Sequence, residues 1–172
     1  MIDPKKIDWK ALKNPAPSFT IFVPTQEKMR VLAKHLMDGY LNMSDEYRDY
    51  QKIWSILTSY FGNGVFNIFY EVGDFKGLLG FTTILPEFKA DVMMKILDKS
   101  VWKPSVIKET RKLLGIIKQE FKLKRLATST PDERVRRIAT MAGFKTEGIS
   151  KNAFQWDGKF YKIYSMSMTK GG

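Results

Sequence analysis

The chain has no cysteine among its 172 residues and only one histidine, His35. Without a thiol it can form neither a disulfide nor a thiolate metal site. With a single imidazole, a zinc site and a Ser-His or Cys-His nucleophile are nearly excluded as well. His35 lies in a stretch with helical apolar periodicity, and we predict an ordinary helix residue there rather than a catalytic base. Hydroxyl chemistry, carboxylate bases and pure binding remain open.

Long apolar runs are also missing. No run approaches the ~20 residues that are needed to span a bilayer. The first 18 residues, MIDPKKIDWKALKNPAPS, lack the apolar core of a signal peptide. A cytoplasmic protein without a membrane partner is therefore expected. The 44% hydrophobic and 27% charged residues are ordinary for a globular protein, and the length favours one domain.

Negative charge is scarce relative to positive charge. The net charge is +11, and residues 99–125 hold nine basic residues against two acidic ones. Such an excess suits an anionic partner, which can be nucleic acid, a membrane surface or a polyphosphate cofactor. A solvated helix face explains part of the same cluster. No motif that reads RNA or DNA appears, so nucleic acid is not expected as a partner.

The N-terminal half predicts an arm, a strand and two helices. The prolines of NPAPS close an arm over residues 1–17, and a single domain is predicted over residues 18–172. A strand in residues 18–25 leads into a helix with Thr25 as its N-cap and Gly39 as its stop. A second helix is predicted to begin at Ser44. Its aromatic face would pack on the sheet or line a groove for an acceptor substrate.

The remaining residues predict a sheet with helical crossovers. The expected elements are strands over residues 65–72, 77–85 and 89–98, a helix over 104–121, a strand over 124–130, a helix from Pro131 to the stop at Gly143, and a final hairpin that turns at Asp157 and Gly158. The first strands form an antiparallel meander, and the later ones are joined through helices. This order predicts an α/β fold with a mixed, mostly antiparallel sheet.

Three segments carry a resemblance to a known family. They are VWKPSVIKETRKLL (residues 101–114), RLATSTPDERVRRIATMAGFKTEG (125–148) and WDGKFYKIYSMSM (156–168). With the element order, they resemble the GNAT superfamily of acyl-CoA-dependent N-acetyltransferases over residues 18–169. The last hairpin resembles the branch that modifies ribosomal-protein N-termini. GFKTEG with WDGKFY resembles phage-type members that have a degenerate pyrophosphate loop.

The resemblance implies acetyl-CoA as co-substrate and splayed central parallel strands flanked by helices. The pantetheine arm would lie between strands 89–98 and 124–130, on the backbone of Ile96, Leu97 and Asp98. The pyrophosphate would lie on the amides that begin the next helix, where an anion is favoured. The residues implied there are Lys103, Pro104, Ser105, Val106 and Ile107, and Asp132 replaces an Asn often found at the start of the later helix.

The pyrophosphate loop departs from the family pattern. Lys103 and Ser105 stand where the family has glycines, and Pro104 between them lacks an amide N–H. Lys103 adds positive charge, Ser105 adds a hydroxyl, and Pro104 suits a first helical turn. Retained binding of CoA and a lost or reshaped site therefore both stay open.

Acetyl transfer to an amine requires a base and polarisation of the thioester carbonyl. Glu87 is the predicted base, because its connection is expected near the splay where acceptors would enter; Glu71 and Asp91 are alternatives. Tyr164 is the predicted acid, with Tyr161 as the alternative. A Tyr that many family members use shortly before Gly-Phe is Ala139 here.

Two functions follow. The first is an N-acetyltransferase that acts on a primary amine of a small molecule or a protein. The second is a non-catalytic protein of GNAT fold used in binding or phage assembly. The sequence does not identify the acceptor, and it does not choose between a monomer and a homodimer.

Overall fold

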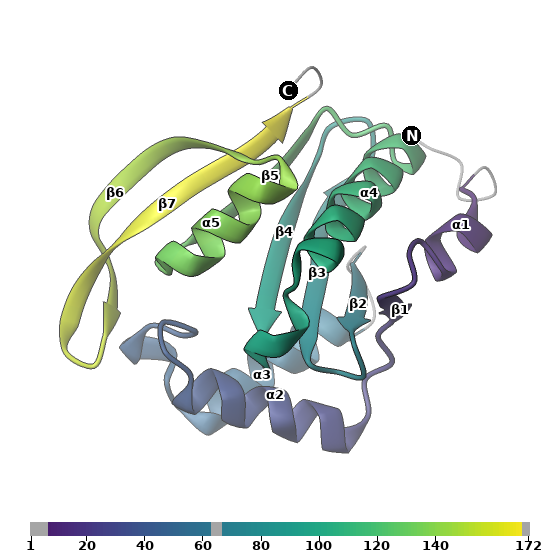
Figure 1. Ribbon diagram of the computed structural model, residues 1–172. Helices are drawn as coiled ribbons and strands as arrows, with labels where there is room; N and C mark the ends of the chain where they lie inside the picture. Colours follow the sequence, from purple (N-terminus) through teal and green to yellow (C-terminus); the bar gives the residue numbers. More distant parts are fainter. Residues whose placement is uncertain (1–6, 63–66, 170–172) are drawn as a thin grey trace.

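The computed structural model describes residues 7–62 and 67–169, which form one seven-stranded sheet with helices on both faces (Figure 1). The strand order is β1-β2-β3-β4-β5-β7-β6. Only β4 and β5 run parallel, and all other neighbours are antiparallel. The predicted mixed, mostly antiparallel α/β fold is confirmed. Within these residues, no helix combines the length and the apolar content that a bilayer crossing requires.

The elements follow the predicted order, with one additional helix at the N-terminus. They are α1 (Trp9–Lys13), β1 (Phe19–Ile21), α2 (Gln26–Asp38), η2 (Asp45–Tyr47), α3 (Tyr50–Phe61), β2 (Ile68–Val72), β3 (Gly77–Leu85), β4 (Lys89–Ile96), η3 (Lys99–Val101), α4 (Pro104–Glu120), β5 (Arg125–Thr130), α5 (Glu133–Ala142), β6 (Lys145–Trp156) and β7 (Lys159–Thr169). The turn predicted at residues 62–64 lies partly outside the described residues.

Two apolar cores lie on opposite faces of the sheet. Neighbouring strand residues point to opposite faces, so Phe69 packs with α2 and α3 while Tyr70 packs with α1 and α4. Figure 1 shows α4 and α5 side by side over one face, and α2 crossing the end of the sheet where β4 stops. Each set of helices packs its own group of buried apolar side chains against one face of the sheet. The sheet is therefore held between the two sets of helices.

The N-terminal segment belongs to the domain rather than lying apart as an arm. Asp8 caps α1, because its side chain accepts hydrogen bonds from the amides of Lys10 and Ala11, both at 3.0 Å. Leu12 is almost fully buried in the core, and its carbonyl oxygen accepts a 2.8 Å hydrogen bond from the Tyr70 hydroxyl. The prediction of an arm is therefore corrected for residues 7–16.

The second predicted helix starts later than expected. Its N-cap is Asp49, which accepts a 2.9 Å hydrogen bond from the Lys52 amide, and not Ser44. The aromatic face is also narrower than predicted, because only Ile53 and Leu57 of α3 are buried. The caps of α2 are as predicted: Thr25 accepts a hydrogen bond from the Lys28 amide, and Gly39 follows the last turn.

The two later helices begin and end close to the predicted residues. Pro104 occupies the first turn of α4, where its missing N–H costs nothing. Asp132 is the N-cap of α5, so Pro131 precedes the helix instead of opening it. Gly143 ends α5 with φ 110°, a left-handed conformation that glycine adopts without strain.

The final hairpin is tied to the loop before α3. Its predicted turn is confirmed, since Asp157 and Gly158 both have positive φ, at 52° and 70°. The Asp45 carboxylate accepts hydrogen bonds from both turn amides, each at 2.9 Å. Arg48 pairs with the same carboxylate at 3.2 Å and lies over the Trp156 ring. Residues more than 100 positions apart are thereby clamped together.

Replacing Asp45 with alanine is expected to release this hairpin tip. The hydrogen bonds from Gly158 and Asp157 lower the pKa of Asp45 below 3.8, so the clamp is complete above that pH and is lost as pH falls through the lowered pKa. In Asp45→Ala, the amides of Asp157 and Gly158 should exchange with solvent at least about 10-fold faster, as hydrogen-exchange NMR would show. Asp45→Asn, which keeps one acceptor oxygen, should be intermediate. Unchanged exchange in both variants would mean that the clamp does not order the turn.

Candidate active site

The two parallel strands separate after three paired positions. Lys89, Ala90 and Asp91 of β4 pair with residues 125–127 of β5, and no pairing continues to the strand ends at Ile96 and Thr130. Figure 1 shows β5 leaving β4 and following β7 instead. Beyond Asp91, the facing backbone edges therefore have no strand partner. The predicted splay is confirmed.

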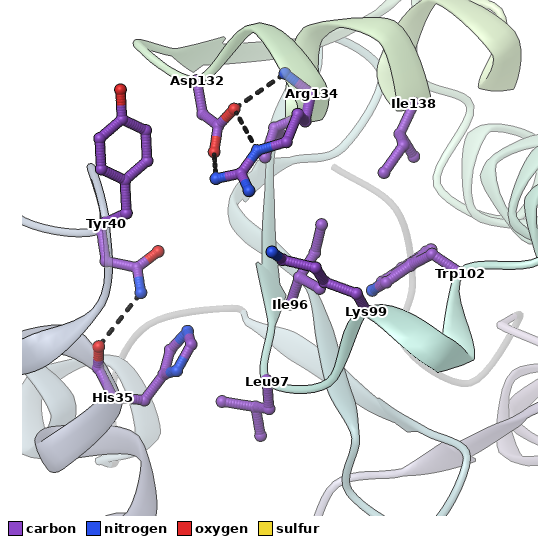
Figure 2. Close-up of a pocket in the computed structure, with 11 residues that line it drawn as sticks. His35, Tyr40, Ile96, Leu97, Lys99, Trp102, Asp132, Arg134 and Ile138 are labelled. Carbon is purple, nitrogen blue, oxygen red and sulfur yellow. Dashed lines mark hydrogen bonds and ion pairs between the residues drawn. The ribbon is translucent and has the colours of Figure 1, made fainter.

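A cavity of about 480 Å³ lies at the open end of this splay, within the size range of small-molecule sites. Four regions line it: α2 with its following loop, the end of β4, η3, and the start of α5. The lining residues are His35, Tyr40, Asn42, Ile96, Leu97, Lys99, Trp102, Asp132, Arg134, Val135 and Ile138. Figure 2 shows these side chains converging from both sides of the opening.

A second cavity of about 590 Å³ adjoins the first and shares Asn42, Asp132 and Val135 with it. It runs along the diverging strands and is more polar. Consecutive residues of both strands line it, 91–95 of β4 and 127–130 of β5. The two cavities give the splay one opening toward η3 and another toward the β6–β7 hairpin.

The start of α4 offers two backbone donors. The amides of Ser105 and Val106 have no partner among the described residues, and no side chain caps the helix. Ile107 is different, because its amide donates a 3.1 Å hydrogen bond to the carbonyl oxygen of Lys103. Lys103 itself is exposed beside the two free amides. This helix end can therefore hold an anion through Ser105, Val106 and the Lys103 ammonium.

The predicted backbone contacts at the end of β4 are partly wrong. The amides of Leu97 and Asp98 both donate to the carbonyl oxygen of Lys76, at 3.0 and 2.8 Å, and so face the β2–β3 turn. Backbone groups alternate between the two edges of a strand, so Ile96 faces the splay. The Asp98 side chain accepts a hydrogen bond from the Ser100 amide, which lowers the pKa of Asp98 and holds η3 in place. Ile96 is therefore the predicted residue whose backbone remains available.

Two glycines behind η3 let it rest close to the sheet. A Cβ on Gly73 would lie 2.6 Å from Cγ2 of Val101, and a Cβ on Gly77 would lie 3.2 Å from Cζ2 of Trp102. The Trp102 ring forms one wall of the cavity, and its Nε1 is buried without a partner in the described chain. The wall is thus set by close packing against the β2–β3 hairpin.

Asp132 reaches the cavity, but it is paired. Arg134 donates to its two oxygens from Nε and Nη2, at 3.1 and 2.7 Å, and the Arg134 amide donates a third hydrogen bond at 2.8 Å. Burial raises the pKa of Asp132, and these hydrogen bonds outweigh that effect and lower it overall. The Arg134 guanidinium also lies 5.4 Å from the centre of the Tyr40 ring. Asp132 therefore positions Arg134 at the cavity and does not present a free carboxylate.

Glu87 and Tyr164 are not brought to the cavities. Glu87 lies in the turn before β4, at the end where β4 and β5 are still paired; its amide donates to the carbonyl of Phe121. The expectation that this turn lies near the splay is wrong. Tyr164 is buried on the α5 side, where the Arg136 guanidinium lies 5.2 Å from the centre of its ring. Both roles remain predictions, and the geometry gives them no support.

The alternative base and acid residues lie in different surroundings. Asp91 lines the second cavity, and its nearest cation is Lys89 at 3.8 Å. Glu71 is paired with Lys28 of α2 and lies on β2, two strands away from β4. Tyr161 packs edge-on against Tyr40 near the hairpin tip, with their ring centres 6.4 Å apart. Asp91 is thus the candidate carboxylate that the structure brings to the splay.

The sequence prediction missed the residues contributed by α2 and its loop. The periodicity predicts an ordinary helix residue at His35, yet its ring points into the cavity in Figure 2. Tyr40 and Asn42 follow in the loop, and the half-buried Lys95 of β4 donates a 3.1 Å hydrogen bond to the Asn42 carbonyl. Desolvation lowers the pKa of Lys95 to about 8. The rarity of histidine in this chain was the one signal that pointed to His35.

Comparison with solved structures identifies the fold. A spermidine N-acetyltransferase from Vibrio cholerae, solved with CoA and spermine, superposes with a TM-score of 0.67 at 12% identity, covering 90% of this chain and 96% of that one. The microcin C7 self-immunity acetyltransferase MccE, solved with acetyl-CoA and AMP, gives 0.65 at 15% identity, covering 90% and 94%. No protein-family model and no curated sequence matches the chain. The chain therefore has the fold of the GNAT acetyltransferases.

Proposed function

We propose that this protein is an acyl-CoA-dependent N-acetyltransferase that transfers the acetyl group of acetyl-CoA to a primary amine. The observation that carries the proposal is the splay of β4 and β5, which opens into a cavity beside the start of α4. In such an arrangement the extended pantetheine arm of acetyl-CoA can pair with the open edge of a strand in place of the missing strand partner. The fold shared with acetyltransferases that bind CoA supports this assignment.

The residues present can hold acetyl-CoA, although their contacts differ from those that a glycine-containing pyrophosphate loop would make. The free amides of Ser105 and Val106 would hold the pyrophosphate, and Lys99 and Lys103 would balance its charge. The backbone of Ile96 would pair with the pantetheine arm along the open edge of β4. Bound there, acetyl-CoA supplies the activated acyl group, and the walls of the cavity shield it from water.

The charges of the second cavity, through which an acceptor would reach the adjoining first cavity, favour an amine with little positive charge elsewhere. Its three carboxylates are each near a cation: Asp132 with Arg134, Glu147 with Arg125, and Asp91 with Lys89. Lys95 adds a further cation to the same lining. A polyamine would find no surplus negative charge here, so we expect a monoamine of a small molecule or a protein N-terminus to be the better acceptor.

Calorimetric titration of acetyl-CoA and CoA, at low and moderate salt, tests the proposal first. Saturable binding with a Kd in the micromolar range, about −8 kcal/mol, is expected. Release of CoA thiol should then be followed with monoamines, peptides and spermidine as acceptors. Turnover with at least one monoamine supports the enzyme.

A second candidate is a non-catalytic protein of this fold, used in binding or in phage assembly. The observation in its favour is the α4 start, where Lys103 and Ser105 replace glycines and Pro104 removes a donor. This candidate predicts no CoA binding even at millimolar ligand. That result would overturn the enzyme assignment.

A further inference from the structure

We infer that His35 is the catalytic base of this site and takes the proton from the acceptor amine. The inference rests on the proposed function and adds a residue to it. The single histidine of the chain lies on α2, across the cavity from Trp102 (Figure 2). Among the described residues that line this cavity, the one carboxylate is that of Asp132, which is held by Arg134.

The backbone of His35 is held in place, and its imidazole has a nitrogen without a partner in the described residues. Its Nε2 is buried and has no hydrogen-bond partner in the described part of the chain. A buried polar atom without a partner is costly, and a ligand that supplies the missing hydrogen bond removes that cost. The backbone around it is secured, because the His35 carbonyl accepts hydrogen bonds from the Gly39 amide at 2.8 Å and from Nδ2 of Asn42 at 3.1 Å.

Helix α2 presents this ring because its other face is buried. Leu32, Ala33 and Leu36 are in the core shared with α3, so the helix cannot rotate without exposing them. His35 is half-buried at the edge of that stripe, and the same cavity contains the Ile96 and Leu97 side chains from the end of β4. An acyl group held along Ile96 and an amine beside His35 would share one enclosed space.

The charges around His35 keep the ring neutral and able to accept a proton. Burial lowers its pKa below 6.5, and the Lys95 ammonium lowers it further. The other titratable or charged groups of the cavity are Tyr40, Lys99 and the Asp132–Arg134 pair. Since Asp132 is neutralised by Arg134, the field at the imidazole is cationic. At pH 7 the ring is therefore uncharged.

The reaction step balances without any further reactant. The amine nitrogen forms a bond to the thioester carbon, and the carbon–sulfur bond breaks with its electron pair leaving on the CoA sulfur. The proton of the amine nitrogen passes to Nε2 of His35. Repulsion from Lys95 then favours release of this proton to solvent, which returns the ring to its neutral state.

His35→Gln tests the inference by kinetics on the monoamine that the wild-type protein acetylates fastest. A positioned base contributes roughly 100-fold or more to rate, so kcat should fall by about 100-fold while acetyl-CoA binding is retained. Wild-type kcat should rise as pH increases through the lowered pKa of His35 and then level off. The rise of kcat with pH should be absent in His35→Gln. Imidazole added to His35→Ala should restore part of the rate.

Lys34→Gln is the matched control, because Lys34 is exposed on the same helix and its change should leave kcat unaltered. A His35→Gln variant with wild-type kcat and an unchanged pH profile would overturn the inference while leaving the proposed function intact. If the wild-type protein did not bind acetyl-CoA, that result would instead contradict the proposed function.

NMR of the single imidazole gives a test without an acceptor. The ring signal of His35 should titrate below 6.5, shift when acetyl-CoA is added, and titrate at a higher pH in Lys95→Gln. A ring that titrates above 6.5 and does not respond to acetyl-CoA would overturn the inference.

Discussion

Lys103→Glu is expected to weaken acetyl-CoA binding by about 100-fold, which corresponds to about 2.7 kcal/mol. Lys103 lies immediately before α4, beside the only two free amides described at that helix end, those of Ser105 and Val106. Reversal of its charge replaces attraction by repulsion at the position proposed for the pyrophosphate. Calorimetry measures the change in Kd directly.

Lys108→Glu provides the comparison, since it makes the same charge change on an exposed position of the same helix, away from its first turn. Its Kd should change by less than about 3-fold. The effect at Lys103 should shrink as salt is raised, because ions screen an exposed charge. Equal Kd values for both variants would show that the start of α4 is not the phosphate site.

Leu12→Ala is expected to cost about 3 kcal/mol of the free energy of unfolding, within the roughly 2–5 kcal/mol measured for buried leucines. Leu12 is almost completely buried, and its carbonyl holds the Tyr70 hydroxyl inside the core. The truncated side chain would leave a cavity under α1. For a domain of this size, Tm should fall by about 6–12 °C. Urea and thermal unfolding followed by circular dichroism measure both quantities.

Lys10→Ala, an exposed change within the same short helix, should alter stability by less than about 0.5 kcal/mol. If Leu12→Ala unfolded at the same urea concentration as the wild type, residues 7–16 would contribute nothing to the core. The prediction that this segment is an arm would then be correct.

The fold was largely predictable because its signals are local. Alternating strands, the Thr25 cap, the Gly143 stop and the Asp157–Gly158 turn each depend on a few neighbouring residues. The predictions failed where a distant partner decides the structure. Ser44 looks like a helix start, but the following Asp45 is bound to the hairpin turn more than 100 residues away, and α3 begins only after Asp49.

The candidate site was less predictable, because a cavity joins residues from separate elements. Sequence order predicted a phosphate-binding end at the start of α4, and this stays a prediction that the two free amides there support. It misplaced Glu87, since sequence does not show which end of β4 opens. It also did not predict His35 as a site residue. Helical periodicity indicates which face of a helix is buried, but not whether a cavity lies beside that face. Lys95 would have looked like any other strand lysine.

The closeness of η3 to the β2–β3 hairpin has a consequence for how such a site can diversify. Gly73 lies behind Val101 and Gly77 behind Trp102, so the missing side chains of these glycines decide how far the Trp102 wall stands back. The width of the cavity at this wall is therefore set from the β2–β3 hairpin. If acetyl-CoA binds as proposed, a larger residue at either position would change the space for the acyl group without itself lining the cavity.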